Sequence, residues 1–150
     1  MNFVSAPQVG FKAPEFTLQT FEGQTVSLTN YQGSPVLINF WATWCPPCRV
    51  EMPDFQQVYD EYSVQGLIIL AVNASNKDSP NDVDQFIKEF NLTFPIPMDT
   101  SGNVGDMYHL QALPTTFFIN RDGMIQHMII GGPLRIPTLD KYLKPLFKGE

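Results

Sequence analysis

Two uninterrupted apolar runs dominate the hydrophobic pattern of this 150-residue chain. Residues 35–40 and 66–73 consist mostly of strand-forming apolar side chains without alternation, which is typical of strands buried on both faces. Between them, residues 46–62 carry apolar side chains at helical spacing, and Pro53 is expected to kink this helix because it removes a backbone donor. The pattern therefore predicts a strand, a helix and a second strand at the centre of the fold.

Weaker patterns surround this centre. Residues 15–20 and 24–28 flank a glycine-containing turn and predict an N-terminal hairpin. Ser79 and Pro80 supply an N-cap and a first-turn proline for a helix with apolar residues at i, i+3, i+4 and i+7. The further expected elements are a short strand at 94–98, a short helix at 103–110, a hairpin of strands at 115–120 and 124–130, and a last helix with Leu139, Tyr142, Leu143 and Leu146. This order predicts one α/β domain, residues 1–150, with a mixed sheet and helices on both faces.

Charge and hydropathy narrow the classes of partner. The net charge is −6, and no cluster of Lys and Arg is visible along the chain, which argues against nucleic acid or an anionic membrane surface. No apolar run approaches the roughly 18 residues of a transmembrane helix. Residues 1–16 lack the basic and apolar regions of a signal peptide. The protein is therefore expected either in the cytoplasm or, after removal of a leader, outside it.

The stretch NFWATWCPPCRVEMP, residues 39–53, contains the only two cysteines, Cys45 and Cys48. A zinc site needs four ligands, and the two histidines of the chain lie far apart in other expected elements, so metal binding is not favoured. Covalent haem attachment needs a histidine at the position that Arg49 occupies. A Cys-x-x-Cys pair at a strand–helix junction instead indicates thiol–disulfide chemistry, with no metal and no cofactor implied.

The two cysteines are expected to have different roles. Cys45 precedes the first helical turn, where unpaired N–H groups and the helix dipole favour a thiolate, so it is the expected nucleophile. Cys48 lies three residues further on the same helix face and can attack the resulting mixed disulfide. Pro46 and Pro47 each remove an N–H that could face the Cys45 sulfur, leaving chiefly that of Cys48. A less stabilised thiolate favours the disulfide form, so the protein is expected to be a reductant.

Three stretches together resemble a known family. NFWATWCPPCRVEMP, the upstream APEFTLQTFEGQTVSL and the downstream LPTTFFINRDG are similar to the TlpA/ResA-like thiol–disulfide oxidoreductases of the thioredoxin superfamily. The resemblance spans roughly residues 10–146. It implies a thioredoxin-like fold: a mixed central sheet flanked by helices, an added N-terminal β-hairpin, and a strand/helix insertion between the second and third core strands. The implied activity is reduction of disulfides in partner proteins through a redox-active disulfide of Cys45 and Cys48.

The resemblance also implies further site residues. Pro114 matches the family's cis-proline beside the disulfide, and Pro114 and Leu113 are assigned to substrate binding. Trp44 resembles the aromatic residue next to the nucleophile, either as a lip that contacts partners or as a packing residue. Glu51 matches an acidic residue that assists proton transfer, and a solvated glutamate near a helix N-terminus is the alternative. Asn39 stands where ordinary thioredoxins have a buried aspartate, so the base is expected to be Glu51.

Partners and location follow from the resemblance alone. Family members often act outside the cytoplasm, where many keep the cysteines of apocytochrome c reduced for haem attachment and receive electrons from a membrane thiol reductase. The expectation is thus a monomeric, extracytoplasmic protein that acts on disulfide-containing proteins, in cytochrome c maturation, with a cytoplasmic location left open.

Two other functions are weighed against this one. The AP-x-F-x-L opening is shared with peroxiredoxins and suggests a peroxidase, but Thr43 does not stand at the spacing from Cys45 that those enzymes need. A copper chaperone of thioredoxin-like fold would need Cys-x-x-x-Cys and a histidine, and the spacing here is one residue shorter. Both alternatives are therefore less favoured than the disulfide reductase.

Overall fold

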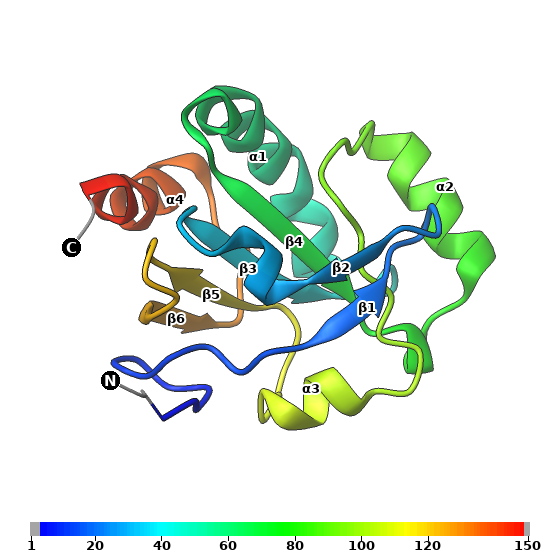
Figure 1. The fold of residues 1–150 in the computed structure, drawn as a ribbon. Helices are drawn as coiled ribbons and strands as arrows, with labels where there is room; N and C mark the ends of the chain where they lie inside the picture. Colours follow the sequence, from blue (N-terminus) through cyan, green and yellow to red (C-terminus); the bar gives the residue numbers. More distant parts are fainter. Residues whose placement is uncertain (1–3, 149–150) are drawn as a thin grey trace.

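A four-stranded mixed sheet in the order β4-β3-β5-β6 forms the centre of the computed structural model (Figure 1). The structure describes residues 4–148, and residues 1–3 and 149–150 lie outside the described part. Residues 1–3 belong to the N-terminal stretch in which the sequence shows no signal-peptide pattern. The central strand β3 (Val36–Trp41) pairs in parallel with β4 (Ile68–Asn73) and antiparallel with β5 (Thr115–Ile119). The antiparallel edge strand β6 (Ile125–Ile130) completes the sheet.

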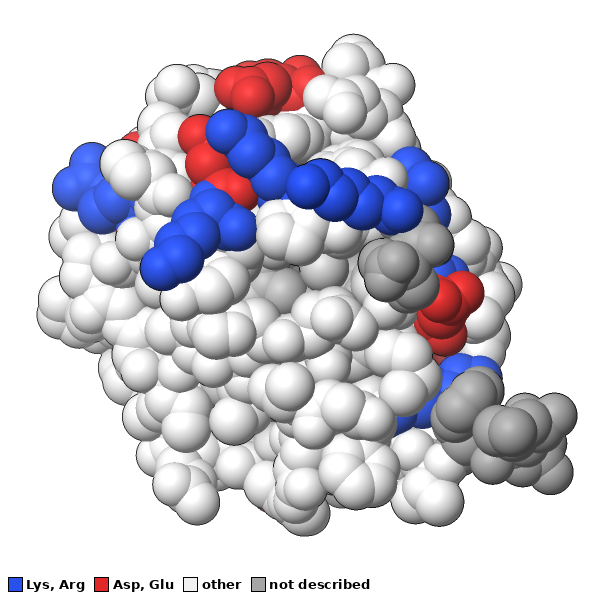
Figure 2. All heavy atoms as spheres, turned by 90° about the vertical axis from the view of Figure 1, so that its left-hand side faces the viewer, with Lys and Arg blue, Asp and Glu red and all other residues white. Residues whose placement is uncertain are grey.

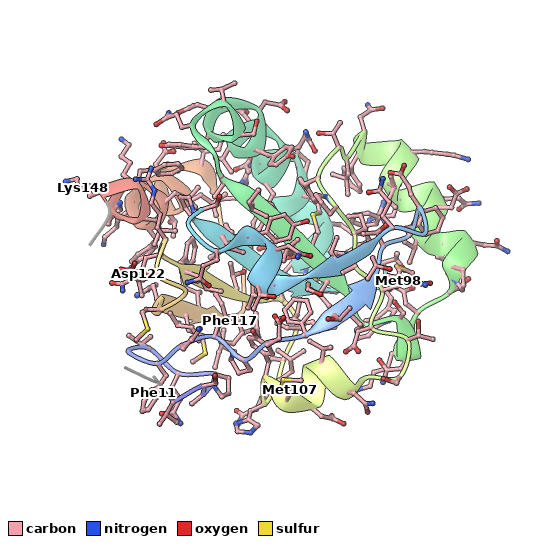
Figure 3. All side chains as sticks on the ribbon, viewed as in Figure 1. Phe11, Met98, Met107, Phe117, Asp122 and Lys148 are labelled. Atoms are coloured by element: carbon pink, nitrogen blue, oxygen red, sulfur yellow. A yellow bond between two sulfur atoms is a disulfide. The ribbon has the colours of Figure 1, made fainter. Side chains whose placement is uncertain are left out.

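Helices cover both faces of this sheet, as the sequence predicts. In Figure 1, α1 (Pro46–Tyr62) and α4 (Ile136–Leu143) lie above it, and α2 (Pro80–Phe90) extends their layer. Side chains that pack between this layer and the sheet include Leu37, Trp41, Ile69, Phe118, Met52, Phe55, Phe86 and Leu139. The short helix α3 (Asn103–Met107) and the N-terminal segment cover the other face. Phe117 is fully buried there, whereas Phe11 and Met107 lie at the periphery (Figure 3).

An N-terminal hairpin of β1 (Thr17–Gln19) and β2 (Thr25–Ser27) forms a separate two-stranded sheet, as expected. The expected strand at 94–98 is absent as a regular element. This extended segment lies beside β4 and accepts hydrogen bonds from it, but Pro95 and Pro97 have no N–H to return, so no continuous ladder forms. Short 3-10 turns complete the described chain: η1 (Leu28–Tyr31), η2 (Ser63–Gln65), η3 (Ser75–Lys77) and η4 (Lys144–Lys148).

The helices differ from the expected ones mainly at their ends. α1 has the expected bounds and continues through Pro53 without ending there. α3 stops at Met107 instead of residue 110, and His109, two residues later, has a φ of 53° that a helix does not tolerate. The last helix ends at Leu143 and passes into η4. None of the helices within residues 4–148 is long and apolar enough to cross a membrane.

Charges are unevenly distributed over the surface. Residues 107–120 and 123–134 contain no Asp, Glu, Lys or Arg. Figure 2, which views the side of the molecule where α4 and β6 lie, shows a broad area without charge below a band of Lys and Arg. Lys141, Lys144 and Lys148 are exposed on α4 and η4.

Candidate active site

The disulfide lies where the central strand passes into helix α1. β3 ends at Trp41, and Cys45 is the N-cap of α1 with Cys48 in its first turn. The two cysteines are disulfide-bonded, with their Cα atoms 5.3 Å apart. Cys45 is 3% exposed and Cys48 is fully buried, so only the first sulfur borders the surface. An approaching disulfide can therefore reach Cys45 more easily than Cys48.

A single hydrogen bond within residues 4–148 reaches the Cys45 sulfur. The N–H of Cys48 donates to Cys45 Sγ at 3.3 Å. Pro46 and Pro47 occupy the positions between them and have no N–H to offer. The expectation that the paired prolines leave chiefly the Cys48 donor is confirmed.

The loop before Cys45 is held by the loop that follows β4. Asp78 accepts hydrogen bonds from the Thr43 N–H at 2.8 Å and the Thr43 hydroxyl at 2.6 Å. It also accepts from Asn73 Nδ2 at 3.0 Å and from the Ser79 N–H at 2.9 Å. Burial opposes ionisation of Asp78, but these hydrogen bonds outweigh it and hold the pKa of the carboxyl below its ordinary value. Sequence reasoning missed Asp78, because Thr43, the partner that connects it to the cysteine loop, lies 35 residues away along the chain.

Trp44 projects from the same loop. Its side chain is 57% exposed, yet its indole Nε1 donates to the carbonyl of Lys77 at 2.8 Å. It lines a groove of about 240 Å³ together with Leu113. The packing interpretation of Trp44 is thus not supported, because most of the side chain faces solvent while the hydrogen bond fixes its direction.

Glu51 is fully buried one helical turn beyond Cys48. The Asn39 amide donates from Nδ2 to Glu51 Oε2 at 2.9 Å, and the Leu134 N–H donates to Glu51 Oε1 at 3.0 Å. Burial raises the pKa of Glu51 to about 7, against the lowering effect of these two hydrogen bonds. The alternative of a solvated glutamate is therefore wrong.

The alternation of strand β3 explains why a polar residue occupies its buried run. Leu37 and Trp41 pack toward α1, and Asn39, two residues from each, lies on the same face. The Asn39 amide also donates to the hydroxyl of Thr116, its register partner on β5, at 3.0 Å. Its carbonyl oxygen Oδ1 has no hydrogen-bond partner among the described residues. Asn39 thus serves Glu51 as a donor and carries no titratable proton.

The segment around Pro114 has the expected backbone. The Leu113–Pro114 bond is cis, and the Pro114 carbonyl accepts a hydrogen bond of 2.7 Å from the N–H of Gly131. This bond joins the start of β5 to the segment between β6 and α4. That second segment supplies Leu134 to Glu51, so it links the Pro114 region with the buried carboxyl.

The histidines take part in other contacts. His127 stacks on Tyr142 with ring centroids 3.8 Å apart, and His109 stands in the turn after α3. Within residues 4–148, no group of three or more His, Cys, Asp and Glu side chains is placed to hold a metal ion. The cysteines therefore have no metal-ligand partners in the part of the chain that the structure describes.

A dithiol that closes to a disulfide at a helix N-terminus, with one sulfur near the surface, can exchange disulfides with another molecule. The fold and this site define the class of thioredoxin-like thiol–disulfide oxidoreductases. The chain belongs to the AhpC/TSA family, whose model matches residues 9–128, and within it to the group of the ResA proteins.

Individual relatives agree with this assignment. The thiol–disulfide oxidoreductase ResA of Oceanobacillus iheyensis is 42% identical over 143 residues, which cover 93% of this chain and 73% of the relative. A thiol:disulfide interchange protein DsbE from Chlorobium tepidum has a TM-score of 0.85 at 30% identity, covering 95% of this chain and 99% of that one. StoA from Bacillus subtilis has a TM-score of 0.75 at 35% identity, covering 86% and 96%. These comparisons confirm the thioredoxin-like fold and the oxidoreductase class.

Proposed function

We propose that this enzyme reduces disulfides in partner proteins, with Cys45 as nucleophile, Cys48 as resolving thiol and Glu51 as proton acceptor and donor. The observation that carries the direction of reaction is that, among residues 4–148, one N–H reaches the Cys45 sulfur. A thiolate with few donors is less stable than one with many, so the dithiol form gives up its electrons more readily.

The reaction begins with attack of the Cys45 thiolate on one sulfur of the partner's disulfide. That bond breaks, a mixed disulfide forms, and the partner's other sulfur leaves as a thiolate that takes a proton from water. Cys48 then transfers its thiol proton to ionised Glu51 and attacks the Cys45 sulfur. The partner's second thiolate is released and protonated, and the enzyme is left as the disulfide. Two electrons have passed to the partner, and a dithiol reductant must return them.

The environment of Glu51 suits this role. An acid–base group works best when its pKa lies near the working pH, and burial brings the pKa of Glu51 to about 7. Glu51 follows Cys48 by three residues on α1, a spacing that places both on one helix face. Asn39 cannot take the proton, because an amide is neither a useful acid nor a base near neutral pH.

The partners that we propose are protein segments whose disulfide lies in an uncharged, extended stretch, apocytochrome c among them. Trp44, Leu113 and Pro114 would contact the partner, and the groove that Trp44 and Leu113 both line supports this assignment for those two residues. The lack of charged residues in 107–120 and 123–134 favours uncharged segments over strongly acidic or basic ones. A membrane thiol reductase is the proposed electron donor.

The proposed location is outside the cytoplasm, because disulfide substrates persist mainly in oxidising compartments. The enzyme is proposed to act as a monomer, since one chain supplies both cysteines and Glu51.

Trapping tests the proposed function. The Cys48→Ser variant, expressed in the native compartment, should accumulate mixed disulfides between Cys45 and its partners, because the resolving thiol is missing. The double variant Cys45→Ser/Cys48→Ser is the matched control and should capture nothing. Identification of apocytochrome c among the trapped proteins would support the pathway. Retention of reductase activity by Cys45→Ser, with nothing trapped by Cys48→Ser, would contradict the mechanism.

A further inference from the structure

Two adjacent glycines lie between β6 and α4, and they are required for different reasons. Gly131 needs to be glycine because its φ of 92° is in the left-handed region. Space is not the reason, since a Cβ there would meet nothing within 4 Å. Gly132 does not have a left-handed φ. A Cβ on Gly132 would lie 2.7 Å from Glu51 Oε1 and 2.9 Å from Pro114 Cγ, distances that real Cβ atoms essentially never show. Only the lack of space requires glycine at 132.

Gly132 covers the buried carboxyl. Gly132 itself is exposed, while Glu51, whose oxygen its missing side chain would touch, is fully buried. Two residues later, the Leu134 N–H donates to that same Oε1 atom. The main chain from Gly132 to Leu134 therefore closes directly over Oε1 and supplies its hydrogen bond.

We propose that Gly132 is a positioning residue of the exchange reaction: the absence of a side chain there lets the segment between β6 and α4 close over Glu51 and bring the Leu134 N–H to its carboxyl. The inference deepens the proposed function and rests on it only for the catalytic consequence. Gly132 contacts no reacting atom and acts through Glu51.

A methyl group at position 132 cannot be accommodated by small movements of the neighbouring side chains. Both oxygens of Glu51 are held, Oε2 by Asn39 and Oε1 by Leu134, and the ring of Pro114 blocks a second direction. The segment must therefore move outward. Such a movement withdraws the Leu134 N–H and admits water to the carboxyl. Burial is the larger of the opposing effects on Glu51, so hydration lowers the pKa of Glu51.

Other charged groups around Glu51 are already accounted for. On α1, Asp54 follows Glu51 by three residues, and its carboxyl is bound to the Arg135 guanidinium at 2.8 Å. β3 and β5 contribute the uncharged Asn39 and, through it, Thr116. The thiol of Cys48, on the same helix, titrates only in the reduced enzyme. The segment from Gly132 to Leu134 thus controls the burial of Glu51 and the hydrogen bond from the Leu134 N–H.

The test uses Gly132→Ala and two readouts. In the oxidised protein, the carboxyl carbon of Glu51 is titrated by ¹³C NMR, and we expect its midpoint to fall from about 7 by about one pH unit or more. In the reduced protein, the pH profile of exchange with a model disulfide should shift by the same amount. Gly105→Ala in α3 is the matched control: like Gly132, Gly105 has no left-handed φ, and a Cβ there would lie 3.4 Å from the carboxyl oxygen Oδ2 of Asp99, so its replacement should leave both Glu51 midpoints unchanged.

The outcomes separate the inference from the proposed function. An unmoved Glu51 midpoint in folded Gly132→Ala overturns the inference. A midpoint that moves while the exchange profile stays in place supports the positioning of Glu51 by Gly132 and contradicts the proton-transfer role of Glu51.

A double-variant cycle covers the case in which Gly132→Ala does not fold. In a Glu51→Ala background the clashing oxygen is gone, so adding Gly132→Ala should reduce the free energy of unfolding less than it does in the wild-type protein. Equal losses in both backgrounds would show that the Glu51 contact is not the reason for glycine, and the inference would be wrong.

Discussion

Asn39 Nδ2 and Glu51 Oε2 are joined by a hydrogen bond of 2.9 Å that ties the central strand to the helix carrying the cysteines. Both side chains are fully buried. The pair replaces the strand carboxylate of ordinary thioredoxins with a neutral donor and moves the titratable group to the helix. In the proposed mechanism, the group that accepts the proton of Cys48 therefore lies on the same helix as Cys48.

Replacing Glu51 by glutamine removes the proposed proton acceptor while keeping the shape of the side chain. We expect release of the partner from the mixed disulfide to slow by about 100-fold, the usual effect of losing a general acid–base group. The inflection of the rate near pH 7 should also disappear. Single-turnover release of a thiol-linked peptide, measured from pH 5 to 9, gives both values. Glu22→Gln, an exposed residue in the β1–β2 turn, is the control, and equal slowing there would contradict the role of Glu51.

The stability of the oxidised protein should depend on the ionisation of Glu51. Its folded pKa of about 7 lies above the ordinary 4.5, so its contribution to stability is fully present below pH 4.5 and is lost as the pH rises through 7. Relative to Glu51→Gln, the free energy of unfolding should fall by about 3 kcal/mol between pH 4.5 and pH 8. Urea unfolding of both proteins at several pH values measures this difference. If the difference in unfolding free energy between the two proteins does not change with pH, the pKa of Glu51 is not raised in the folded state.

Restoring a backbone donor next to Cys45 should make the enzyme a weaker reductant. Pro47→Ala returns an N–H to the first turn of α1, where the Cys48 N–H is otherwise the one donor to the Cys45 sulfur in the described part of the chain. The pKa of the Cys45 thiol should fall by about one pH unit, because the thiolate gains a hydrogen bond. Thiolate absorbance against pH in the reduced protein, with a redox titration against glutathione, tests this. A higher thiol pKa, or an unchanged reduction potential, would contradict the explanation.

Asp78 should stabilise the loop that carries the nucleophile. Asp78→Ala leaves the N–H and hydroxyl of Thr43 without their acceptor, and we expect a loss of about 1–3 kcal/mol in the free energy of unfolding. The pKa of Asp78 is lowered in the folded state, so its contribution is present above its ordinary value of 3.8 and is lost as the pH falls further. The rate at which Cys45 is alkylated in the reduced protein should also change, because the loop before Cys45 is held less firmly. Asp82→Ala, on the exposed first turn of α2, is the control for removal of a carboxylate.

Local signals account for the parts of the fold that were predictable. The bounds of α1 and α2 follow from residues that act within one turn, such as Ser79 as N-cap and Pro80 in the first turn. β3 was predictable because its apolar run can only be buried. The roles expected for Cys45 and Cys48 come from the same strand–helix junction. By contrast, the composition of residues 94–98 predicts a strand, but the missing N–H groups of Pro95 and Pro97 prevent a regular one, and only isolated bridges form.

The surroundings of Glu51 depend on contacts between distant segments and could not be read from the chain. Leu134 lies 83 residues after Glu51, and nothing in its neighbourhood marks its N–H as a donor to a carboxylate. Asp78 is similar, since its bond to Thr43 forms only when the loop after β4 lies against the loop after β3. Pattern and motif identify the reacting atoms, while tertiary packing sets their protonation and orientation.

The extended segment beside β4 has a consequence for an enzyme that exchanges disulfides with other polypeptides. An open strand edge is a template for pairing with other polypeptides and hence for aggregation. Here the Ala71 and Asn73 N–H groups of β4 are taken by the carbonyls of Pro95 and Pro97, and the N–H groups of Phe21 and Met98 join that segment to the N-terminal hairpin. The backbone donors of Ala71 and Asn73 are therefore not available to a partner polypeptide that would otherwise add to this part of β4 as a strand.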